Sequence, residues 1–200
     1  MNRRNALQLV KDLYGTQRRE GLDKFSSEHS LDVVTYCFLH LERDNLRAMR
    51  ILNVAILHDV VEDFSQEGYT LEKVQSVVGL GQREIRLLNL LTRKKGQEAE
   101  YLPLLFQDED AARIKLADRI ANCRDLAAWV QGTQGFPPRA RRIYEKYKRE
   151  NAVILELIQE HFQAQAEDPD HVFFHQIPLL QKNMAELDRL YAQYFGAWAN

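Results

Sequence analysis

Apolar residues along the chain recur at intervals of three and four positions, which is the spacing of an amphipathic helix. Before Gly15, such a face is formed by Ala6, Leu9, Val10 and Leu13. No segment combines sustained alternation with enrichment in β-branched residues, the pattern that predicts a strand. The pattern therefore predicts an all-α protein.

The same spacing predicts a series of further helices, separated by glycine, proline and polar residues. They cover roughly residues 31–41, 46–61, 71–79, 85–91, 98–106, 109–129, 139–162 and 178–195. The helix over 46–61 is apolar on nearly all sides, which is typical of a buried helix. Residues 15–27 are predicted to form a polar, basic loop.

The clearest break in the chain is GTQGFPP, residues 132–138. It divides a core, residues 1–135, from a C-terminal helical extension, residues 136–200. We expect the extension to pack on the core within a single globular unit, because 200 residues is an ordinary length for one domain.

Composition and charge narrow the picture further. Hydrophobic residues make up 45% of the chain, enough for a core, and a net charge of −2 gives no overall basic field for nucleic acid. The two cysteines lie within apolar helical patterns and are expected to be buried free thiols. No apolar run approaches the ~20 residues of a membrane span, and the first residues lack the apolar stretch of a signal peptide. We expect a cytoplasmic protein.

The most informative stretch is ILNVAILHDVVEDF, residues 51–64, where a strongly apolar helix ends in four ionisable groups. Burying such groups unpaired costs several kcal/mol each, so something must compensate them. His58 and Glu62 are four residues apart, as are Asp59 and Asp63, and each pair lies on one side of a helix. The first pair can supply a nitrogen and an oxygen to one cation, and the second can lie beside a metal-bound water.

Two further residues fit the same site. Asp118, next to Arg119, falls on the apolar face of ARIKLADRIANCRDLAAW, residues 112–129, and His29 opens another apolar helix. Each alone has an ordinary explanation: His29 as a helix cap or surface histidine, and Asp118 as the partner of Arg119 in an ion pair. A histidine, an HD dipeptide and an acid on three apolar helices together predict a shared metal site.

These motifs resemble the hydrolase domain of the RelA/SpoT family, within the HD superfamily of metal-dependent phosphohydrolases, and its small stand-alone relatives. The resemblance rests on HDVVED followed by TLEKV and then IKLADRIANCRDL, and it extends from about residue 5 to 129. It implies an HD-domain helical bundle with extra C-terminal helices. It also implies a Mn²⁺ enzyme that removes the 3′-pyrophosphate from (p)ppGpp-like alarmones of the stringent response.

Carried over by position, the resemblance implies a specific set of metal ligands. They are His29, His58, Asp59 and Asp118. Two imidazoles and two carboxylates suit Mn²⁺, with Fe²⁺, Zn²⁺ and Mg²⁺ as alternatives. Glu62 and Asp63 match the acidic pair that handles the water, and either can accept its proton. The alternative role for this pair is to orient His58.

The predicted substrate contacts are Arg18, Arg19 and Lys24, in the loop before His29, and Asn122, which matches an asparagine near the nucleotide. The three basic residues can contact phosphates or face a base, or they can form a solvated loop. The chain departs from the family around this pocket.

Among these departures, Ser30 follows His29 in place of a proline, Phe64 follows HDVVED in place of a threonine, and Asp125 replaces a threonine often found near the nucleotide. Arg119 is expected to orient a carboxylate rather than to bind a ligand. Because the departures touch the pocket and not the ligands, two other functions stay open.

The first is an HD phosphohydrolase acting on a nucleoside monophosphate, an adenosine alarmone or a pyrophosphorylated RNA end. The second is a nucleotide-binding regulatory HD protein whose C-terminal helices dock a partner. In either case the expected ligand is a small-molecule nucleotide, with no membrane partner and no nucleic acid other than an RNA end. The sequence predicts no particular oligomeric state.

Overall fold

The computed structural model describes residues 5–195, and within that range the chain consists of helices and loops with no strand. The all-α prediction is confirmed. The elements follow the predicted order along the chain. They are α1 (Ala6–Tyr14), α2 (Ser26–Cys37), α3 (Asn45–Leu57), α4 (Val60–Asp63), α5 (Leu71–Val74), the π-helical turn η1 (Gln75–Gly79), α6 (Gln82–Leu91), α7 (Glu98–Leu105), α8 (Glu109–Thr133), α9 (Pro138–Glu167) and α10 (Val172–Phe195).

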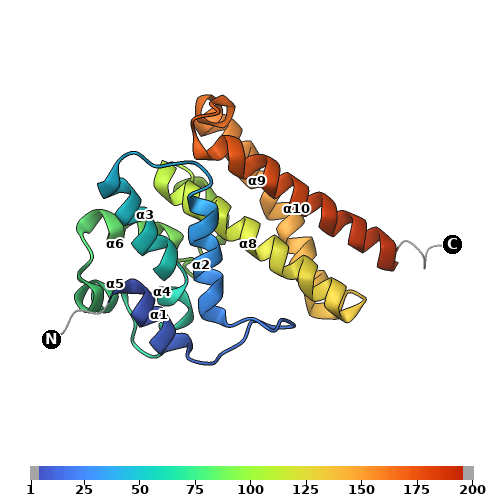
Figure 1. Ribbon diagram of the computed structural model, residues 1–200, viewed down its shortest axis with the longest axis horizontal. Coiled ribbons are helices and arrows are strands. Elements are labelled where there is room, and N and C mark those ends of the chain that lie inside the picture. The colour runs from blue at the N-terminus through green and yellow to red at the C-terminus, as the bar shows by residue number, and fades with distance from the viewer. Residues whose placement is uncertain (1–4, 196–200) are drawn as a thin grey trace.

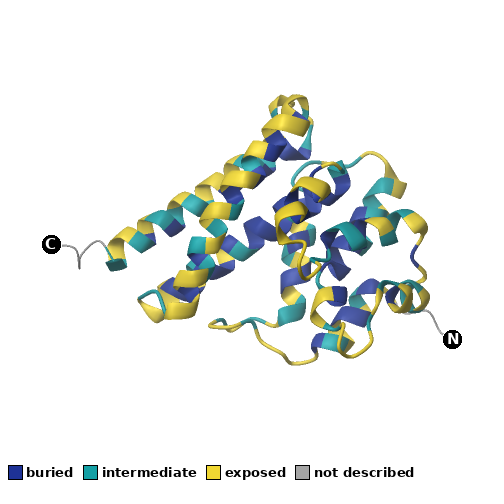
Figure 2. Cartoon of the chain, turned by 180° about the vertical axis from the view of Figure 1, so that it is seen from behind, coloured by how far each residue is buried: buried dark blue, intermediate teal, exposed yellow. Residues whose placement is uncertain are grey.

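The helix α8 forms the centre of the molecule. Figure 1 shows it running between the shorter helices that precede it and the long antiparallel pair α9 and α10. At its N-terminus, the side chain of Asp108 accepts hydrogen bonds from the backbone N–H groups of Asp110 and Ala111. This N-cap satisfies N–H groups that have no acceptor within the helix. Its buried residues are spread around its circumference (Figure 2). A helix packed on several sides can place charged side chains in the interior.

The buried face of α2 differs from the predicted one. In the helix predicted over residues 31–41, the apolar spacing of Leu31, Val34, Phe38 and Leu41 marks one face, but Leu31 and Leu41 are 41% and 77% exposed, and the helix ends at Cys37. The buried face runs instead through Ser30, Val33 and Cys37. This is a shift of one residue, or about 100° around the helix, and it turns the neighbouring His29 inward.

The predicted helix over 46–61 is interrupted. The helix α3 ends at Leu57, His58 and Asp59 form a turn, and α4 resumes at Val60. Burial is confined to the second half of α3, and Leu46 is exposed. His58 and Asp59 keep right-handed helical backbone angles across the break.

The last helix also begins earlier than predicted. Pro178 was expected to open it, because proline suits a first helical turn, but α10 begins at Val172 and contains Pro178. Proline removes the hydrogen bond to the carbonyl four residues earlier. That residue is Phe174, which is exposed, so water can satisfy the carbonyl.

The C-terminal extension packs on the core through α8. The amide of the fully buried Gln176 donates hydrogen bonds of 3.0 Å to the backbone oxygens of Tyr36 on α2 and Arg113 on α8. Asn183 donates to the backbone oxygen of Ile120 at 3.3 Å. Such buried hydrogen bonds fix the extension relative to the core because breaking them leaves polar groups unsatisfied.

Two remaining expectations concern cysteines and membranes. Cys37 and Cys123 are buried free thiols, as predicted. Among the residues that the structure describes, no helix combines the length and apolar character needed to cross a bilayer.

Phe173 provides a test of how the extension contributes to stability. Its ring is fully buried against Phe162, whereas the neighbouring Phe174 is 41% exposed. We expect Phe173→Ala to lower the free energy of unfolding by about 3–5 kcal/mol, the usual cost of emptying a buried aromatic site. Phe174→Ala is the matched control and should change it by less than about 1 kcal/mol. Equal effects in urea denaturation would contradict the packing described here.

Glu109 provides a pH-dependent test. The His171 imidazole and the Arg47 guanidinium lower the pKa of Glu109 to about 2, against the opposing effect of burial. A carboxylate whose pKa is lowered in the folded state stabilises that state at pH values above its ordinary pKa. This stabilisation is lost as the pH falls and the carboxylate is protonated. The stability difference between wild type and Glu109→Gln should therefore be largest above about pH 4.5 and vanish towards about pH 2. Thermal unfolding across this range measures it, with the exposed Glu160→Gln as control, and a difference independent of pH would contradict it.

Candidate functional site

Four side chains predicted to hold a metal come together from three parts of the chain. His29 lies in the first turn of α2, His58 and Asp59 form the turn between α3 and α4, and Asp118 lies on α8. Ligand atoms of His29, His58 and Asp59 lie within 4.8 Å of one another. Oδ1 of Asp118 lies 3.3 Å from Nε2 of His29 and 3.6 Å from Nε2 of His58.

The imidazole of His58 is oriented by the backbone. Its Nδ1 donates to the carbonyl oxygen of Ala55 at 2.8 Å, which turns Nε2 towards the carboxylates of Asp59 and Asp118. Nε2 lies 3.0 Å from Oδ2 of Asp59 but has no aligned hydrogen-bond partner among the described residues. Burial alone would lower the pKa of His58, yet the carboxylates of Asp59 and Asp118 raise it to about 10. This position attracts positive charge.

The carboxylate of Asp118 is buried and uses both of its oxygens. Oδ2 pairs with Lys115 Nζ at 2.8 Å, and Oδ1 accepts from the amide of Asn122 at 2.5 Å and faces the two imidazoles. Burial favours the neutral acid, but Lys115 and the imidazoles hold the pKa of Asp118 well below its usual range. Asp118 therefore stays ionised, with Oδ1 facing the other predicted ligands.

The second nitrogen of His29 faces another carboxylate. Nδ1 of His29 lies 3.7 Å from Oδ2 of Asp125, which is on the same face of α8 as Asp118, two turns further along. Carboxylates commonly orient metal-bound histidines through the nitrogen that does not bind the metal. Asp125 is thus placed to fix the ring of His29.

The residues present fit a divalent ion. Two imidazoles and two carboxylates form a mixed nitrogen and oxygen donor set, which suits Mn²⁺ and its neighbours in the first transition series. The unpartnered Nε2 of His58 is the kind of buried atom that a metal would satisfy.

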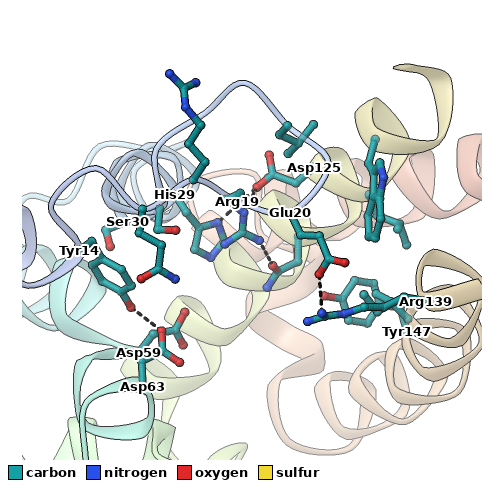
Figure 3. A pocket seen from close by; sticks show the side chains of 18 residues that line it. Tyr14, Arg19, Glu20, His29, Ser30, Asp59, Asp63, Asp125, Arg139 and Tyr147 are labelled. Atoms are coloured by element: carbon teal, nitrogen blue, oxygen red, sulfur yellow. Dashed lines mark hydrogen bonds and ion pairs between the residues drawn. The ribbon is translucent and has the colours of Figure 1, made fainter. Parts of the chain in front are cut away.

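A cleft of about 440 Å³ opens on one side of these residues (Figure 3). Its walls include the loop before α2, with Arg19 and Glu20, and the start of α9, with Arg139 and Tyr147. Glu20 and Arg139 form an ion pair of 2.7 Å that joins the two walls. The cleft is large enough for a small molecule such as a nucleotide.

The loop before α2 approaches α8 very closely at Gly21. Gly21 has a φ of +72°, and a Cβ there would lie 2.1 Å from Cδ1 of Trp129. Only glycine fits both the backbone conformation and the contact. Trp129 also lines the cleft, so the close approach fixes one wall.

A smaller chamber of about 130 Å³ lies on another side of the same residues. The residues Asp59, Asn122 and Tyr147 line both the cleft and the chamber. The chamber is lined by His58 and Asp118 from the centre and by basic side chains from three segments. These are Arg93, Lys115, Arg119 and Lys146.

The acidic pair is divided between the two cavities. Glu62 lines the chamber together with His58, and Asp63 lines the cleft together with Asp59, so the four-residue spacing is kept despite the break at His58. Glu62 accepts a hydrogen bond of 3.1 Å from the backbone N–H of Arg93. Asp63 accepts one of 2.5 Å from the hydroxyl of Tyr14, and burial and nearby carboxylates raise its pKa.

Three of the four predicted substrate contacts line the cleft, and one does not. Arg18, Arg19 and Asn122 line the cleft, and Arg19 donates to Asn122 at 2.7 Å. Arg18 pairs with Asp23. Lys24 does not line the cleft.

Instead, Lys24 pairs with Asp32 and, at 2.7 Å, with Asp125, which also pairs with Arg19 at 2.7 Å. Two of the predicted phosphate contacts therefore share the negative charge of Asp125. As expected, Arg119 pairs with a carboxylate, which is Glu150 on α9.

Several residues of the site were not predicted from the sequence. Lys115 is one of them, although it lies three residues from Asp118, so helical spacing could have identified it. Asp125, seven residues from Asp118, was named only as a departure from the family pattern. Tyr14, Lys146 and Glu150 come from distant segments, and no local pattern indicates that they reach this site.

In comparisons with known proteins, no family model matches the chain, and no curated protein sequence matches it.

We expect Mn²⁺ to raise the Tm of the protein in a concentration-dependent way, because a metal that binds only the folded state stabilises it. Asp59→Ala should weaken Mn²⁺ binding by about tenfold or more, because it removes an anionic ligand. The matched control is Asp170→Ala, in the exposed loop before α10. Titration calorimetry and metal analysis measure both, and full Mn²⁺ binding by Asp59→Ala would rule out the ligand set.

Proposed function

We propose that the protein is a metal-dependent phosphohydrolase of the HD type that removes the 3′-pyrophosphate from (p)ppGpp-like alarmones. The observation that carries this proposal is the meeting of two imidazoles and two carboxylates between a nucleotide-sized cleft and a small basic chamber. The arrangement supports a reaction at a phosphorus atom near the metal, with one part of the substrate in the cleft and another in the chamber. The resemblance of HDVVED and IKLADRIANCRDL to the RelA/SpoT hydrolases supports the choice of substrate.

In this proposal His29, His58, Asp59 and Asp118 hold Mn²⁺. When bound, the ion lowers the pKa of water and polarises the phosphorus centre. Asn122 positions the substrate near Asp118, to which its amide already donates. Lys115 keeps Asp118 ionised.

Glu62 or Asp63 takes the proton of the attacking water. The new bond joins the water oxygen to phosphorus, the bond from phosphorus to the 3′-oxygen breaks, and that oxygen receives a proton. Burial and the nearby Asp59 and Glu62 raise the pKa of Asp63, which makes its carboxylate a better proton acceptor, and the Tyr14 hydroxyl fixes its position.

One observation favours a second candidate, an HD phosphohydrolase with another nucleotide as substrate. Asp125 pairs with both Arg19 and Lys24, which reduces the positive charge available on that side of the cleft. A less anionic group would fit there, such as the sugar and base of a nucleoside monophosphate, an adenosine alarmone or a pyrophosphorylated RNA end.

An activity panel tests the proposal. The purified protein with Mn²⁺ is assayed on ppGpp, pGpp, deoxynucleoside monophosphates and cyclic dinucleotides. Release of pyrophosphate and GDP from ppGpp is the expected result. Release of phosphate from a monophosphate would support the second candidate, and nucleotide binding without turnover would support a regulatory protein instead.

The acidic pair is tested with Glu62→Gln and Asp63→Asn. The variant that lacks the proton acceptor should lose about 10²-fold or more in kcat while it still binds Mn²⁺ in calorimetry. Asp170→Asn, in the exposed loop before α10, serves as the control. Full kcat in both variants of the pair would remove them from the mechanism.

A further inference from the structure

The chamber of about 130 Å³ is too small for a nucleoside, since pockets for drug-sized ligands have about 300–1,000 Å³. Its basic residues come from three segments of the chain. Arg93 follows α6, Lys115 and Arg119 lie on α8, and Lys146 lies on α9. Side chains of one sign gathered from separate elements favour a small anionic group.

The carboxylates around the chamber are shared unevenly among these cations. Lys115 pairs with Asp118. The other three share one carboxylate, Glu150, which lies 3.1 Å from Arg93, 2.5 Å from Arg119 and 3.9 Å from Lys146. With Asp59 and Asp118 assigned to the metal, Glu62 is the other carboxylate that lines the chamber. The three cations around Glu150 therefore outnumber the one carboxylate that they share.

Arg119 gives an independent indication of a ligand. It is 3% exposed, yet its Nε and one terminal nitrogen, Nη1, have no hydrogen-bond partner among the described residues. Buried donors left unpaired cost free energy, which an acceptor in the chamber would recover. The guanidinium lies over the ring of Tyr147, 4.3 Å from its centroid, so it is held in place before any ligand arrives.

Lys146 supplies the more exposed part of the same wall. Its side chain is about half exposed and only loosely paired with Glu150. Burial and the nearby Arg93, Arg119 and Lys115 lower its pKa, which agrees with a positive potential in the chamber. A flexible ammonium group can follow a phosphate group that Arg119 fixes.

We propose that the chamber is a diphosphate-binding subsite, in which Arg119 and Lys146 hold the pyrophosphate that the reaction releases. This inference rests on the proposed function for the identity of its ligand, but its binding chemistry does not require turnover. It also gives the C-terminal extension a role, because Lys146, Tyr147 and Glu150 all belong to α9. The extension completes the substrate site rather than merely covering the core.

The test uses the full chain without metal and without nucleotide. In EDTA, binding of inorganic pyrophosphate is measured by titration calorimetry and by the shift in Tm. Wild type should bind it saturably and at least about tenfold more tightly than orthophosphate, because a diphosphate can contact several of the cations at once. Loss of one charge-assisted hydrogen bond costs about 1.5–3 kcal/mol, so Lys146→Ala and Arg119→Gln should each weaken binding by about tenfold or more.

Lys148→Ala is the matched control, since Lys148 is also an exposed cation on α9 but pairs with Asp188 and does not line the chamber. Its affinity for pyrophosphate should equal that of wild type. If Arg119→Gln fails to fold, Lys146→Ala alone decides the matter.

Three results would overturn the subsite: no pyrophosphate binding by wild type, equal affinity for orthophosphate, or equal losses in Lys146→Ala and Lys148→Ala. Because neither metal nor turnover is needed, an inactive enzyme that binds pyrophosphate would contradict only the proposed function. An active enzyme without this binding would contradict only the subsite.

Discussion

The structure depends on one buried carboxylate, that of Asp118, which is surrounded by Lys115 and the imidazoles of His29 and His58. An ionised group in the interior is costly unless it is paired and hydrogen-bonded. Here the partners come from α2, from the end of α3 and from α8 itself. The need to compensate this charge therefore constrains how these three helices are placed relative to one another.

The helices could be predicted from the sequence because their periodicity is local. The four candidate ligands could be named because their motifs have a distinctive order and spacing. The inward face of α2 could not be predicted, since burying His29 and Ser30 matters more there than burying Leu31. The break after Leu57 could not be predicted either. Helix propensity is a local property and does not reflect the contacts that His58 and Asp59 make with distant helices. The role of these residues in binding metal stays a prediction.

The parts of the site that were missed share a physical cause. Tyr14 reaches it from α1 through its hydrogen bond to Asp63, and Lys146 and Glu150 reach it from α9. Tertiary contacts between segments that lie tens of residues apart leave no trace in local patterns. By contrast, Lys115 lies three residues from Asp118 on one helix, so helix geometry alone would have been enough to find it.

The absence of a side chain at Gly21 also defines the dimensions of the cleft. The backbone there rests directly on the indole of Trp129. The loop before α2 and the helix α8 are therefore separated by one van der Waals contact. Any larger residue would act as a spacer that widens the entrance and shifts Arg19 with it. The width of the cleft at this wall therefore depends on a residue that has no side chain and does not itself line the cavity.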